Sequence, residues 1–278
     1  MSTWQAGPMR DVTKDTQLCI SLSARPTNIG TRFHNYLYEV LDLNYVYKAF
    51  RPTNIEQAIA GVRGLGIRGC AVSMPWKEAV IPLVDHMAES AAAIQSVNTI
   101  VNDDGHLTAY NTDYQAIYNL LESHQVPRGS FAVLGAGGMA KAAVAALTNA
   151  GFGPGTVVAR NEQTGRALAD QYGNSWAPDA DGLDASLILN ATPVGMSGGP
   201  AEHELAVPQD VVERSATIFD VVAFPSETPL ITAARAAGKP VITGAEVIAL
   251  QAAEQFVLYT GVRPTNEQVA EASRISRA

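Results

Sequence analysis

The stretch Phe131-Ala132-Val133-Leu134-Gly135-Ala136-Gly137-Gly138-Met139-Ala140 decides the fold of this chain of 278 residues. Its first four residues have the apolar pattern of a buried strand, and an alanine-rich helical pattern follows as far as Ala150. Glycines between a strand and a helix are typical of the turn that holds a dinucleotide pyrophosphate at the helix N-terminus. The stretch therefore predicts a nucleotide-binding βα unit.

Three small residues of this turn have separate physical roles. Gly135 allows the tight turn, and Gly137 lets the backbone approach a pyrophosphate closely. Ala140 lets the helix pack closely against the strand. Because glycine also serves in ordinary βα turns, the prediction rests on the placement of the pattern between a strand and a helix.

Strand and helix patterns alternate along most of the chain. The first 115 residues include strand patterns at Leu18–Leu22 and Tyr45–Phe50 and a hairpin turn at Asp103-Asp104-Gly105. From Phe131 onward, strands alternate with helices at the spacing of a parallel, doubly wound sheet of the Rossmann type. The chain is also longer than one usual domain. We expect an α/β protein of two domains, 1–115 and 116–244, with C-terminal helices at 245–278 that return to the first domain.

The composition argues against several kinds of partner. The 27 acidic residues outnumber the 19 basic ones, and the net charge of −8 disfavours nucleic acid or an anionic membrane as the main partner. Met1–Lys14 lacks the apolar core of a secretion signal, and no apolar run approaches the ~18 residues of a membrane span. Cys19 and Cys70 lie in apolar runs, which favours buried reduced thiols. We expect a cytoplasmic protein, either a monomer or a homodimer.

A single lysine follows the end of an apolar strand pattern. The pattern runs over Ile67–Met74, and Pro75 stops it because proline has no backbone N–H. Lys77 is then held at a strand tip, where a positioned amine can donate or accept a proton. The alternative is a surface lysine at the start of a helix that opens at Glu78.

The end of the strand pattern at Thr156–Arg160 indicates which nucleotide is bound. An NAD site usually has an acidic residue there for the ribose hydroxyls. This chain has Arg160, whose guanidinium can pair with a 2′-phosphate through charge-assisted hydrogen bonds. The predicted cofactor is therefore NADP, and the alternative is an ordinary exposed arginine.

Polar side chains near strand ends are candidates to bind a substrate. Asn98 lies on one arm of the hairpin and Asp113 ends the other, so that the two can converge near Lys77. Ser21 and Ser23 lie two residues apart at a strand end, where both hydroxyls can receive a carboxylate. The alternative is that these residues cap turns or belong to ordinary loops.

The chain has five histidines, and none shows the spacing of a metal site. His34 lies within the helical pattern of Arg32–Leu41, which favours a packed or capping side chain over a catalytic one. The sequence therefore predicts no metal centre.

Taken together, these segments resemble the shikimate dehydrogenase family over nearly the whole chain. The order and spacing of several short stretches carry the resemblance. They are Ser21–Ser23, Val72–Lys77, Ser96–Thr99, Asn111–Asp113, the Gly135 loop, Asn190–Met196 and Gly244–Gln251. The resemblance implies a substrate domain followed by an NADP domain, and an enzyme that reduces the small molecule 3-dehydroshikimate with NADPH.

The resemblance also implies roles for single residues. Lys77 and Asp113 would be the catalytic pair beside the C3 oxygen of the substrate. A cation there lowers the barrier because negative charge builds on the oxygen when hydride reaches the carbon. The implied substrate-binding residues are Ser21 and Ser23 for the carboxylate and Ser73, Asn98 and Gln251 for the ring hydroxyls. The implied cofactor-binding residues are Gly135, Ala136, Gly137, Gly138, Met139, Ala140, Arg160, Asn190, Thr192 and Gly244.

The chain departs from the usual family pattern at positions assigned to ligands. Ala71 stands where the family commonly has asparagine, Ser73 where it has threonine, and Asp220–Pro225 lacks the usual tyrosine. Thr164 stands where a second basic residue is common on the adenosine side. Each lost neutral hydrogen bond removes roughly 0.5–1.5 kcal/mol. The departures resemble a divergent shikimate dehydrogenase-like branch, so we expect weaker shikimate binding with the Lys77 chemistry retained.

Two other functions are open at this point. A quinate dehydrogenase would share the fold, tolerate one more hydroxyl and use NAD or NADP. A nucleotide-binding sensor would keep the cleft but have little turnover. The presence of Lys77 and Asp113 argues against a sensor, because a sensor needs no proton-transfer pair.

Overall fold

The computed structural model describes residues 12–277. Most of Met1–Lys14, where the sequence predicts no secretion signal, lies outside the described residues. Contacts divide the chain into two compact units: unit 1 comprises the residues up to Thr112 and those from Ala249 onward, and unit 2 runs from Asp113 to Ile248. Within the described range, no helix is both long and apolar enough to cross a membrane.

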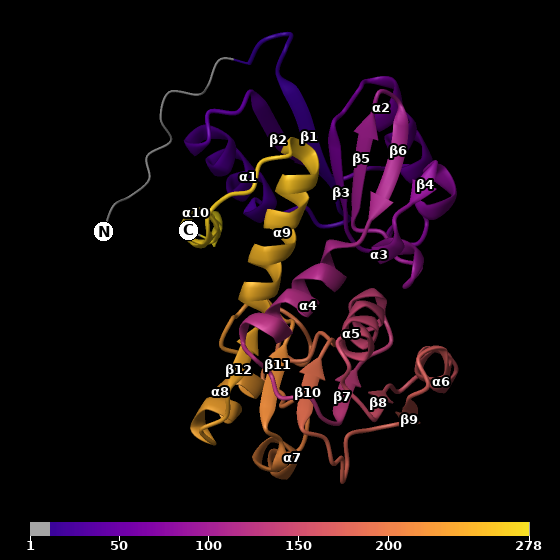
Figure 1. Ribbon diagram of the computed structural model, residues 1–278, viewed down its shortest axis with the longest axis vertical. Coiled ribbons are helices and arrows are strands. Elements are labelled where there is room, and N and C mark those ends of the chain that lie inside the picture. Colours follow the sequence, from indigo (N-terminus) through magenta and orange to yellow (C-terminus); the bar gives the residue numbers. More distant parts are fainter. Residues whose placement is uncertain (1–11, 278) are drawn as a thin grey trace. The chain divides into compact units, whose positions relative to one another are not determined.

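Unit 1 contains a mixed six-stranded sheet in the order β2-β1-β3-β5-β6-β4 (Figure 1). Its strands are β1 (Gln17–Leu22), β2 (Tyr45–Phe50), β3 (Gly69–Val72), β4 (His86–Met87), β5 (Thr99–Asp103) and β6 (His106–Tyr110). β1 is parallel to β2 and β3, whereas β5 is antiparallel to β3 and β6. The carboxyl ends of β1, β3 and β6 therefore meet the amino end of β5 at one edge of the sheet.

Side chains alternate between the two faces of this sheet, and each face has its own core. Ile20 and Val72 belong to the cluster on the face that packs against α2 (Ile55–Gly64). The opposite face packs against α1 (Ile29–Val40), α9 (Gly244–Thr260) and α10 (Asn266–Arg277). An aromatic-rich cluster joins these three helices to the sheet. Both faces of the sheet are therefore covered within unit 1.

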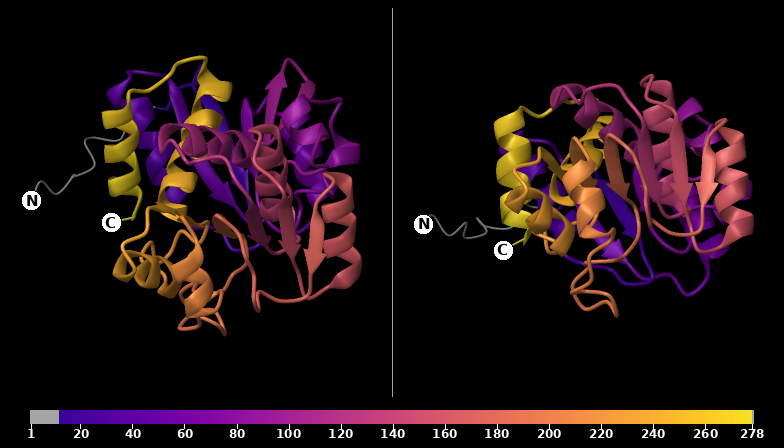
Figure 2. Two further views of the ribbon diagram at one scale, coloured as in Figure 1. Left: turned by 60° about the horizontal axis from the view of Figure 1, so that its bottom comes forward. Right: turned by 90° about the horizontal axis from the view of Figure 1, so that it is seen from below.

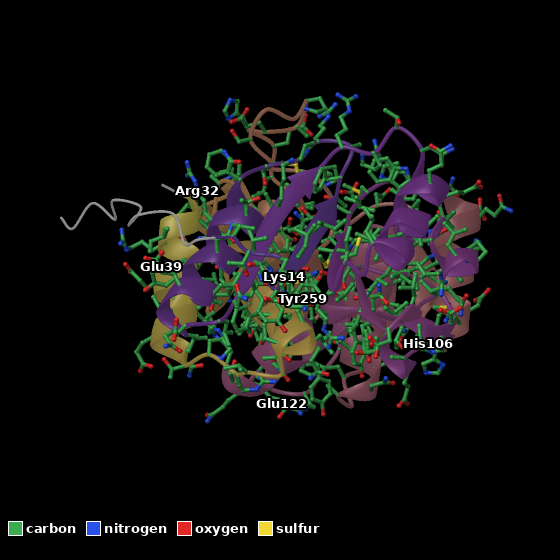
Figure 3. All side chains as sticks on the ribbon, turned by 90° about the horizontal axis from the view of Figure 1, so that it is seen from above. Lys14, Arg32, Glu39, His106, Glu122 and Tyr259 are labelled. Carbon is green, nitrogen blue, oxygen red and sulfur yellow. The ribbon has the colours of Figure 1, made fainter. Side chains whose placement is uncertain are left out.

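The close packing of α9 on the sheet depends on Gly69 of β3. A Cβ atom at Gly69 would lie 2.3 Å from the ring of Tyr259, which is labelled on α9 in Figure 3. The Tyr259 ring is fully buried in the same cluster as Phe256. The missing side chain at Gly69 thus lets the C-terminal half of α9 lie directly on the strand.

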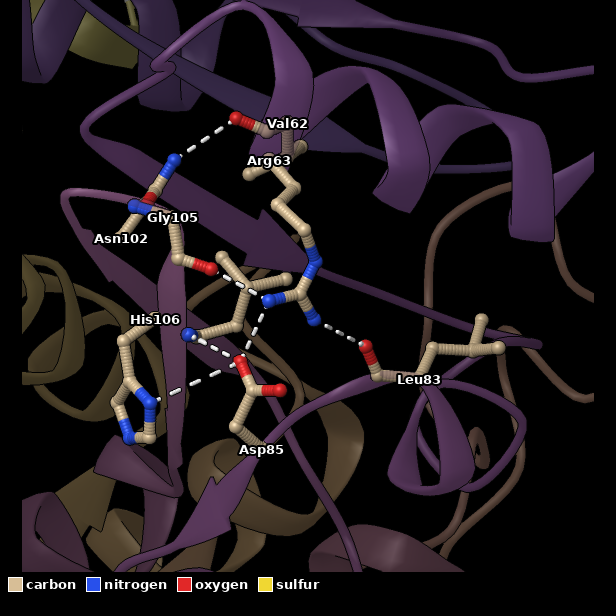
Figure 4. Close-up of polar contacts among 8 residues, drawn as sticks. Val62, Arg63, Leu83, Asp85, Asn102, Gly105 and His106 are labelled. Atoms are coloured by element: carbon tan, nitrogen blue, oxygen red, sulfur yellow. Dashed lines mark hydrogen bonds and ion pairs between the residues drawn. The ribbon is translucent and has the colours of Figure 1, made fainter.

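A charged cluster holds the β5–β6 hairpin against α2 (Figure 4). Arg63 of α2 donates to the Asp85 carboxylate at 2.6 Å and to the carbonyl oxygens of Leu83 and Gly105. Asp85 Oδ2 also accepts from the backbone N–H of Leu107 at 2.7 Å. The hydrogen bond from the Arg63 side chain is the main reason why the pKa of Asp85 lies below its usual value. One ion pair thus joins segments that lie far apart in the sequence.

Unit 2 contains a parallel six-stranded sheet in the order β12-β11-β10-β7-β8-β9. Its strands are β7 (Phe131–Leu134), β8 (Gly155–Val158), β9 (Ser175–Ala177), β10 (Leu187–Asn190), β11 (Thr217–Asp220) and β12 (Val241–Thr243). The strand order reverses beside β7, as it does in the Rossmann dinucleotide-binding fold. The predicted fold class, α/β with a doubly wound Rossmann-type domain, is confirmed.

Helices follow most strands of unit 2. They are α4 (Thr112–Ser123), which begins at the division of the units, α5 (Gly138–Asn149), α6 (Glu162–Gln171), α7 (Gln209–Arg214) and α8 (Pro229–Ala236). The alanines of α5 are buried, which lets this helix approach the sheet closely. The salmon helix at the right of both views in Figure 2 is α6, which packs on β8 and β9. A Cβ at Gly165 of α6 would lie 2.5 Å from the Trp176 ring.

Several predicted boundaries were wrong by a few residues. β3 ends at Val72 rather than Met74, and β8 ends at Val158 rather than Arg160. The short strands β4 and β9 and the helices α4 and α7 were not predicted. Segments of two to six residues carry too few side chains to establish a period, and α4 opens on polar residues that were interpreted as a turn.

Candidate functional site

The edge of the unit 1 sheet at the carboxyl ends of β1 and β3 gathers most predicted substrate residues. Ser73 follows β3, and its N–H donates to the carbonyl oxygen of Leu22 at 3.0 Å. Asn98 precedes β5, and its carbonyl oxygen accepts from the N–H of Val72 at 2.8 Å. The N–H of Asn98 in turn donates to the carbonyl oxygen of Tyr110 at 3.1 Å. Backbone pairing therefore brings these strand ends together.

The Asn98 side chain is the centre of a buried polar cluster. Its Oδ1 accepts from the backbone N–H of Thr112 at 2.8 Å and from the Thr99 hydroxyl at 2.8 Å. Its Nδ2 donates to the Thr112 hydroxyl at 3.1 Å and to Gln251 Oε1 at 3.3 Å. Asn98 is 2% exposed, whereas Gln251 on α9 is half-buried. The fold thus brings Asn98 and Gln251 together, although 153 residues separate them in the sequence.

Lys77 lies in a series of turns that follows β3. Residues 74–80 form turns, and the next helical segment is η1 (Ile81–Leu83), so the alternative of a helix opening at Glu78 is wrong. The carbonyl oxygen of Lys77 accepts from the N–H of Val97 at 2.9 Å, which anchors the backbone next to Asn98. The side chain of Lys77 is half-buried.

Asp113 is the second residue of α4, in its first turn. It is 1% exposed and follows Thr112, whose N–H is bound by Asn98. An acidic residue in the first turn also suits the positive end of the helix dipole. Asp113 is grouped with unit 2, and its pairing with Lys77 stays a prediction.

Two serines lie at the carboxyl end of β1. Ser21 is half-buried and is the register partner of Ala71 on β3. Burial raises the pKa of the Tyr47 phenol, and a hydrogen bond with Ser21 partly offsets this effect. Ser23 Oγ accepts from the N–H of Arg25 at 3.1 Å, which leaves the hydroxyl hydrogen of Ser23 to donate elsewhere.

The turn between β7 and α5 has the geometry that the glycine pattern predicts. Gly135 has a φ of 108°, a conformation that favours glycine, and its N–H donates to Val158 O at 2.8 Å. Gly137 is the N-cap of α5, and no described side chain caps this end of the helix. A Cβ atom at Gly137 would have no atom within 4 Å. The space beside Gly137, at the uncapped N-terminus of α5, is therefore open, which suits the approach of a phosphate group.

Arg160 lies in the loop between β8 and α6 and is exposed. The next residue, Asn161, caps α6, because its Oδ1 accepts from the N–H of Thr164 at 3.1 Å. The hydroxyl of Thr164 donates to the carbonyl oxygen of Asn161 at 3.3 Å. Thr164 therefore stabilises the helix start, and Arg160 supplies the positive charge next to it.

A buried polar network lies at the ends of β10 and β11. Asn190 and Asp220 are register partners, and Asn190 Nδ2 donates to Asp220 Oδ1 at 3.0 Å. Asn190 Oδ1 accepts from the Thr192 hydroxyl at 2.6 Å, while the Thr228 hydroxyl donates to Asp220 Oδ2 at 2.6 Å. Burial raises the pKa of Asp220 to about 6. This network fixes the loop that contains the predicted cofactor residue Thr192.

Gly244 begins α9 immediately after β12. A Cβ atom there would lie 2.3 Å from the carbonyl oxygen of Val222. The preceding Thr243 donates its N–H to Glu246 Oε2 at 2.9 Å, as a helix start requires. The backbone at Gly244 is thus packed directly on the segment that follows β11.

Comparison with known proteins agrees with this arrangement. Residues 27–100 match the family model of the shikimate dehydrogenase substrate binding domain. A shikimate dehydrogenase-like protein of Haemophilus influenzae is 53% identical over 96% of this chain and 98% of its own length. The chain belongs to the shikimate dehydrogenase family.

Two solved structures show how this family fold occurs with different ligands. A shikimate 5-dehydrogenase of Thermus thermophilus, in complex with NADP(H) and shikimate, is 29% identical with a TM-score of 0.83 and covers 94% of this chain and 99% of its own. A quinate dehydrogenase of Corynebacterium glutamicum, in complex with NAD, is 27% identical with a TM-score of 0.83. This match covers 94% of the present chain and 98% of the quinate dehydrogenase chain. The fold of the shikimate dehydrogenase family therefore does not by itself identify the substrate or the cofactor.

Two polar residues of this shikimate dehydrogenase family member were missed in the sequence. Gln255 lies one helical turn after Gln251 and donates through Nε2 to Thr99 Oγ1 at 3.0 Å. The spacing of four residues between the two glutamines was the available signal, because such residues share one helix face. Asp220 was also missed, and its signal is a charged residue at the end of the apolar strand β11.

His34 is a packed residue, as predicted. Its ring stacks on Tyr47 with centroids 4.4 Å apart, and burial lowers its pKa from 6.5 to about 3. Cys19 and Cys70 are buried free thiols. Within residues 12–277, no three or more His, Cys, Asp or Glu side chains are arranged to hold a metal ion.

Proposed function

We propose that this protein is an NADP-dependent oxidoreductase that interconverts a ring hydroxyl and a ketone, with shikimate and 3-dehydroshikimate as the first candidate pair. The observation that carries the proposal is the Asn98 cluster, in which one buried amide organises Thr112 and Gln251 at the sheet edge. Amide and hydroxyl groups that converge in this way suit a ligand with several hydroxyl groups. Membership of the shikimate dehydrogenase family supports the same reaction class.

In the proposed reaction, Lys77 and Asp113 form the proton-transfer pair. NADPH, when bound, supplies the hydride that reduces the carbonyl carbon. The Lys77 ammonium stabilises the negative charge that builds on the carbonyl oxygen and donates a proton to it. Asp113 orients the amine of Lys77 towards the carbonyl oxygen. In the reverse direction, the neutral amine of Lys77 accepts the hydroxyl proton.

The proposed substrate contacts all come from unit 1. Ser21 and Ser23 donate to the substrate carboxylate, and because Ser23 Oγ accepts from the N–H of Arg25, the hydroxyl hydrogen of Ser23 can make this bond. Ser73, Asn98 and Gln251 contact the ring hydroxyls. Because Asn98 is held by Thr112 and Thr99, its amide is positioned before the substrate arrives, which lowers the entropic cost of binding.

The residues of unit 2 fit an NADP cofactor. The N-terminus of α5 has no side-chain cap, and the space beside Gly137 is open, so the turn Gly135–Ala140 can hold a pyrophosphate. The exposed Arg160 guanidinium suits a 2′-phosphate. Asn190, Thr192 and Gly244 complete the proposed cofactor contacts.

Quinate is the second candidate substrate. Ala71 lies in register between Ser21 on β1 and Thr99 on β5, at a position where the family commonly has asparagine. The smaller side chain removes a hydrogen-bond partner and leaves room for a further hydroxyl. Phe224 is 69% exposed in the stretch that commonly carries a tyrosine. The solved quinate dehydrogenase supports this candidate at the level of the fold.

Paired kinetics with shikimate and quinate, each with NADP⁺ and NAD⁺, test the proposal. We expect turnover with at least one of the two acids and a preference for NADP⁺. Binding of NADPH without turnover of either acid or of a panel of ring hydroxy and keto acids would exclude the oxidoreductase function. The ratio of kcat/KM values for the two acids decides between the two candidate substrates.

A further inference from the structure

Behind Asn98, a chain of hydrogen bonds connects it to a second glutamine of α9. Gln255 Nε2 donates to Thr99 Oγ1 at 3.0 Å and to the carbonyl oxygen of Asn98 at 3.3 Å. Thr99 Oγ1 donates to Asn98 Oδ1 at 2.8 Å. Gln255 is 6% exposed and Thr99 is 0% exposed, so water does not compete for these bonds.

Backbone groups fix the direction of each amide in this chain. The N–H of Thr112 can only donate, so the atom of Asn98 that it contacts at 2.8 Å is Oδ1. The other end of the Asn98 amide is therefore Nδ2, a donor. Its partner on Gln251, at 3.3 Å, must then be the acceptor Oε1. As a consequence, the amino group of Gln251 is not used by Asn98 and is left to donate to a ligand.

The same argument applies to Gln255. The carbonyl oxygen of Asn98 can only accept, so the atom of Gln255 that contacts it is Nε2. Thr99 Oγ1 accepts from that Nε2, and its single hydrogen is then directed to Asn98 Oδ1. Gln255 thus sets the direction of the Thr99 hydroxyl, and Thr99 in turn adds a second donor to Asn98 Oδ1.

We propose that Gln255, acting through Thr99, is a positioning residue that adds a second donor to Asn98 Oδ1 and, together with the Thr112 N–H, holds the amide of Asn98 so that Gln251 donates to a substrate oxygen. The inference rests on the proposed function, because it assumes that Asn98 and Gln251 contact the substrate. It adds to that function a chemical requirement: the substrate group at Gln251 must be a hydrogen-bond acceptor, such as a hydroxyl or carbonyl oxygen. Neither Gln255 nor Thr99 needs to touch the substrate in this role.

Thr99→Val tests the proposal, since valine keeps the shape of threonine and removes the hydroxyl. We expect KM for shikimate to rise about three- to tenfold, the effect of one neutral hydrogen bond, with KM for NADP⁺ changed less than about twofold. Thr99→Ser retains the hydroxyl and should restore the KM for shikimate. Thr108→Val on β6, a half-buried position in the same sheet, is the matched control and should leave both KM values unchanged.

A double variant tests whether Gln255 acts through Thr99. Gln255→Met should raise KM for shikimate in the same direction, and Thr99→Val/Gln255→Met should raise it by less than the product of the two single effects. Independent, multiplicative effects would overturn the proposal. So would a Thr99→Val variant with the kinetics of Thr108→Val.

A readout without turnover separates this inference from the proposed function. Proton exchange of the Asn98 side-chain amide, followed by NMR in the full chain, should be faster in Thr99→Val than in the wild type and Thr108→Val. If the wild type turns over neither shikimate nor quinate but this difference is found, the proposed function fails while the positioning of Asn98 stands. Equal exchange in all three proteins would overturn the positioning role.

Discussion

Asp220 accepts a hydrogen bond from the Asn190 amide at 3.0 Å inside unit 2, although desolvation makes its charged form costly. Hydrogen bonds from Thr228, Val222 and Asn190 lower the pKa of Asp220, but the larger effect of burial raises it from 3.8 to about 6. The carboxyl group at the base of the Thr192 loop therefore changes its charge close to neutral pH.

Replacing Asp220 with asparagine should change how stability depends on pH. The folded pKa of about 6 exceeds the ordinary value of 3.8, so the folded state holds this proton more tightly and stability falls as pH rises between these values. As pH rises across that interval, the unfolding free energy of Asp220→Asn should increase by on the order of 2 kcal/mol relative to that of the wild type. Urea unfolding on both sides of the interval measures the difference, and a constant difference would contradict this role of Asp220.

His34 should have the opposite effect on stability. Its pKa is lowered from 6.5 to about 3, so the unfolded chain takes up a proton that the folded chain does not. The stability that neutral His34 contributes is complete above pH 6.5 and is lost as pH falls towards 3. His34→Phe keeps a ring that can stack on Tyr47. The variant should take up about one proton fewer than the wild type on unfolding, and the slope of the unfolding free energy against pH measures this number. The exposed His86→Phe is the control and should keep the wild-type dependence.

Lys77→Ala tests the proposed proton donor. Loss of a general acid should lower kcat by about 10²- to 10⁴-fold, while the affinity for NADPH, measured by fluorescence titration, should stay within about twofold. Lys48→Ala is a suitable control, because Lys48 lies in the same unit with its amine over the Phe50 ring. Wild-type turnover in Lys77→Ala would show that Lys77 is not the proton donor.

Arg160→Ala tests the proposed recognition of the 2′-phosphate. KM for NADPH should rise about tenfold or more, the effect of a lost charge-assisted hydrogen bond, whereas KM for NADH should hardly change. Arg166→Ala on α6 is the matched control, because Arg166 pairs with Glu162 and lies over Trp176. Equal effects of Arg160→Ala on both cofactors would rule out a role in phosphate recognition.

Gly244→Ala should destabilise unit 2. The new Cβ atom would lie 2.3 Å from the carbonyl oxygen of Val222 and 2.4 Å from that of Val221, so the backbone must move. We expect a loss on the order of 2 kcal/mol, seen as a lower melting temperature. Gly64→Ala at the end of α2 has no atom within 4 Å of the new Cβ and should be neutral or slightly stabilising. Similar melting temperatures for the two variants would contradict the close packing at Gly244.

The sequence predicted those features that depend on neighbouring residues. The βα turn at Gly135 and the hairpin at Asp104 follow from local backbone preferences and short apolar patterns. The Rossmann topology of unit 2 followed from the alternation of strands and helices, since right-handed crossovers leave few other arrangements. Local information was therefore enough for the fold class.

Features that depend on distant pairs were less accessible. The assignment of Asn98 and Gln251 to one substrate site was reached only through resemblance to a family, and their hydrogen bond was not predicted, because no local pattern relates residues so far apart. Asp220 and Gln255 were missed, since their roles depend on register partners and on the face that α9 turns to the sheet. Helix α4 was missed because its first residues, Thr112 and Asp113, favour turns as readily as helix starts.

The hydrogen bond from the Thr112 N–H to Asn98 has a consequence for how substrate preference can evolve. Asn98 satisfies a first-turn N–H of α4, so a substitution at Asn98 would disturb a helix start as well as the proposed substrate contact. Ala71, in the same sheet, carries no polar group and can be exchanged without that penalty. New substrates in this lineage are therefore expected to arise through changes around Ala71, while the amide at position 98 is retained.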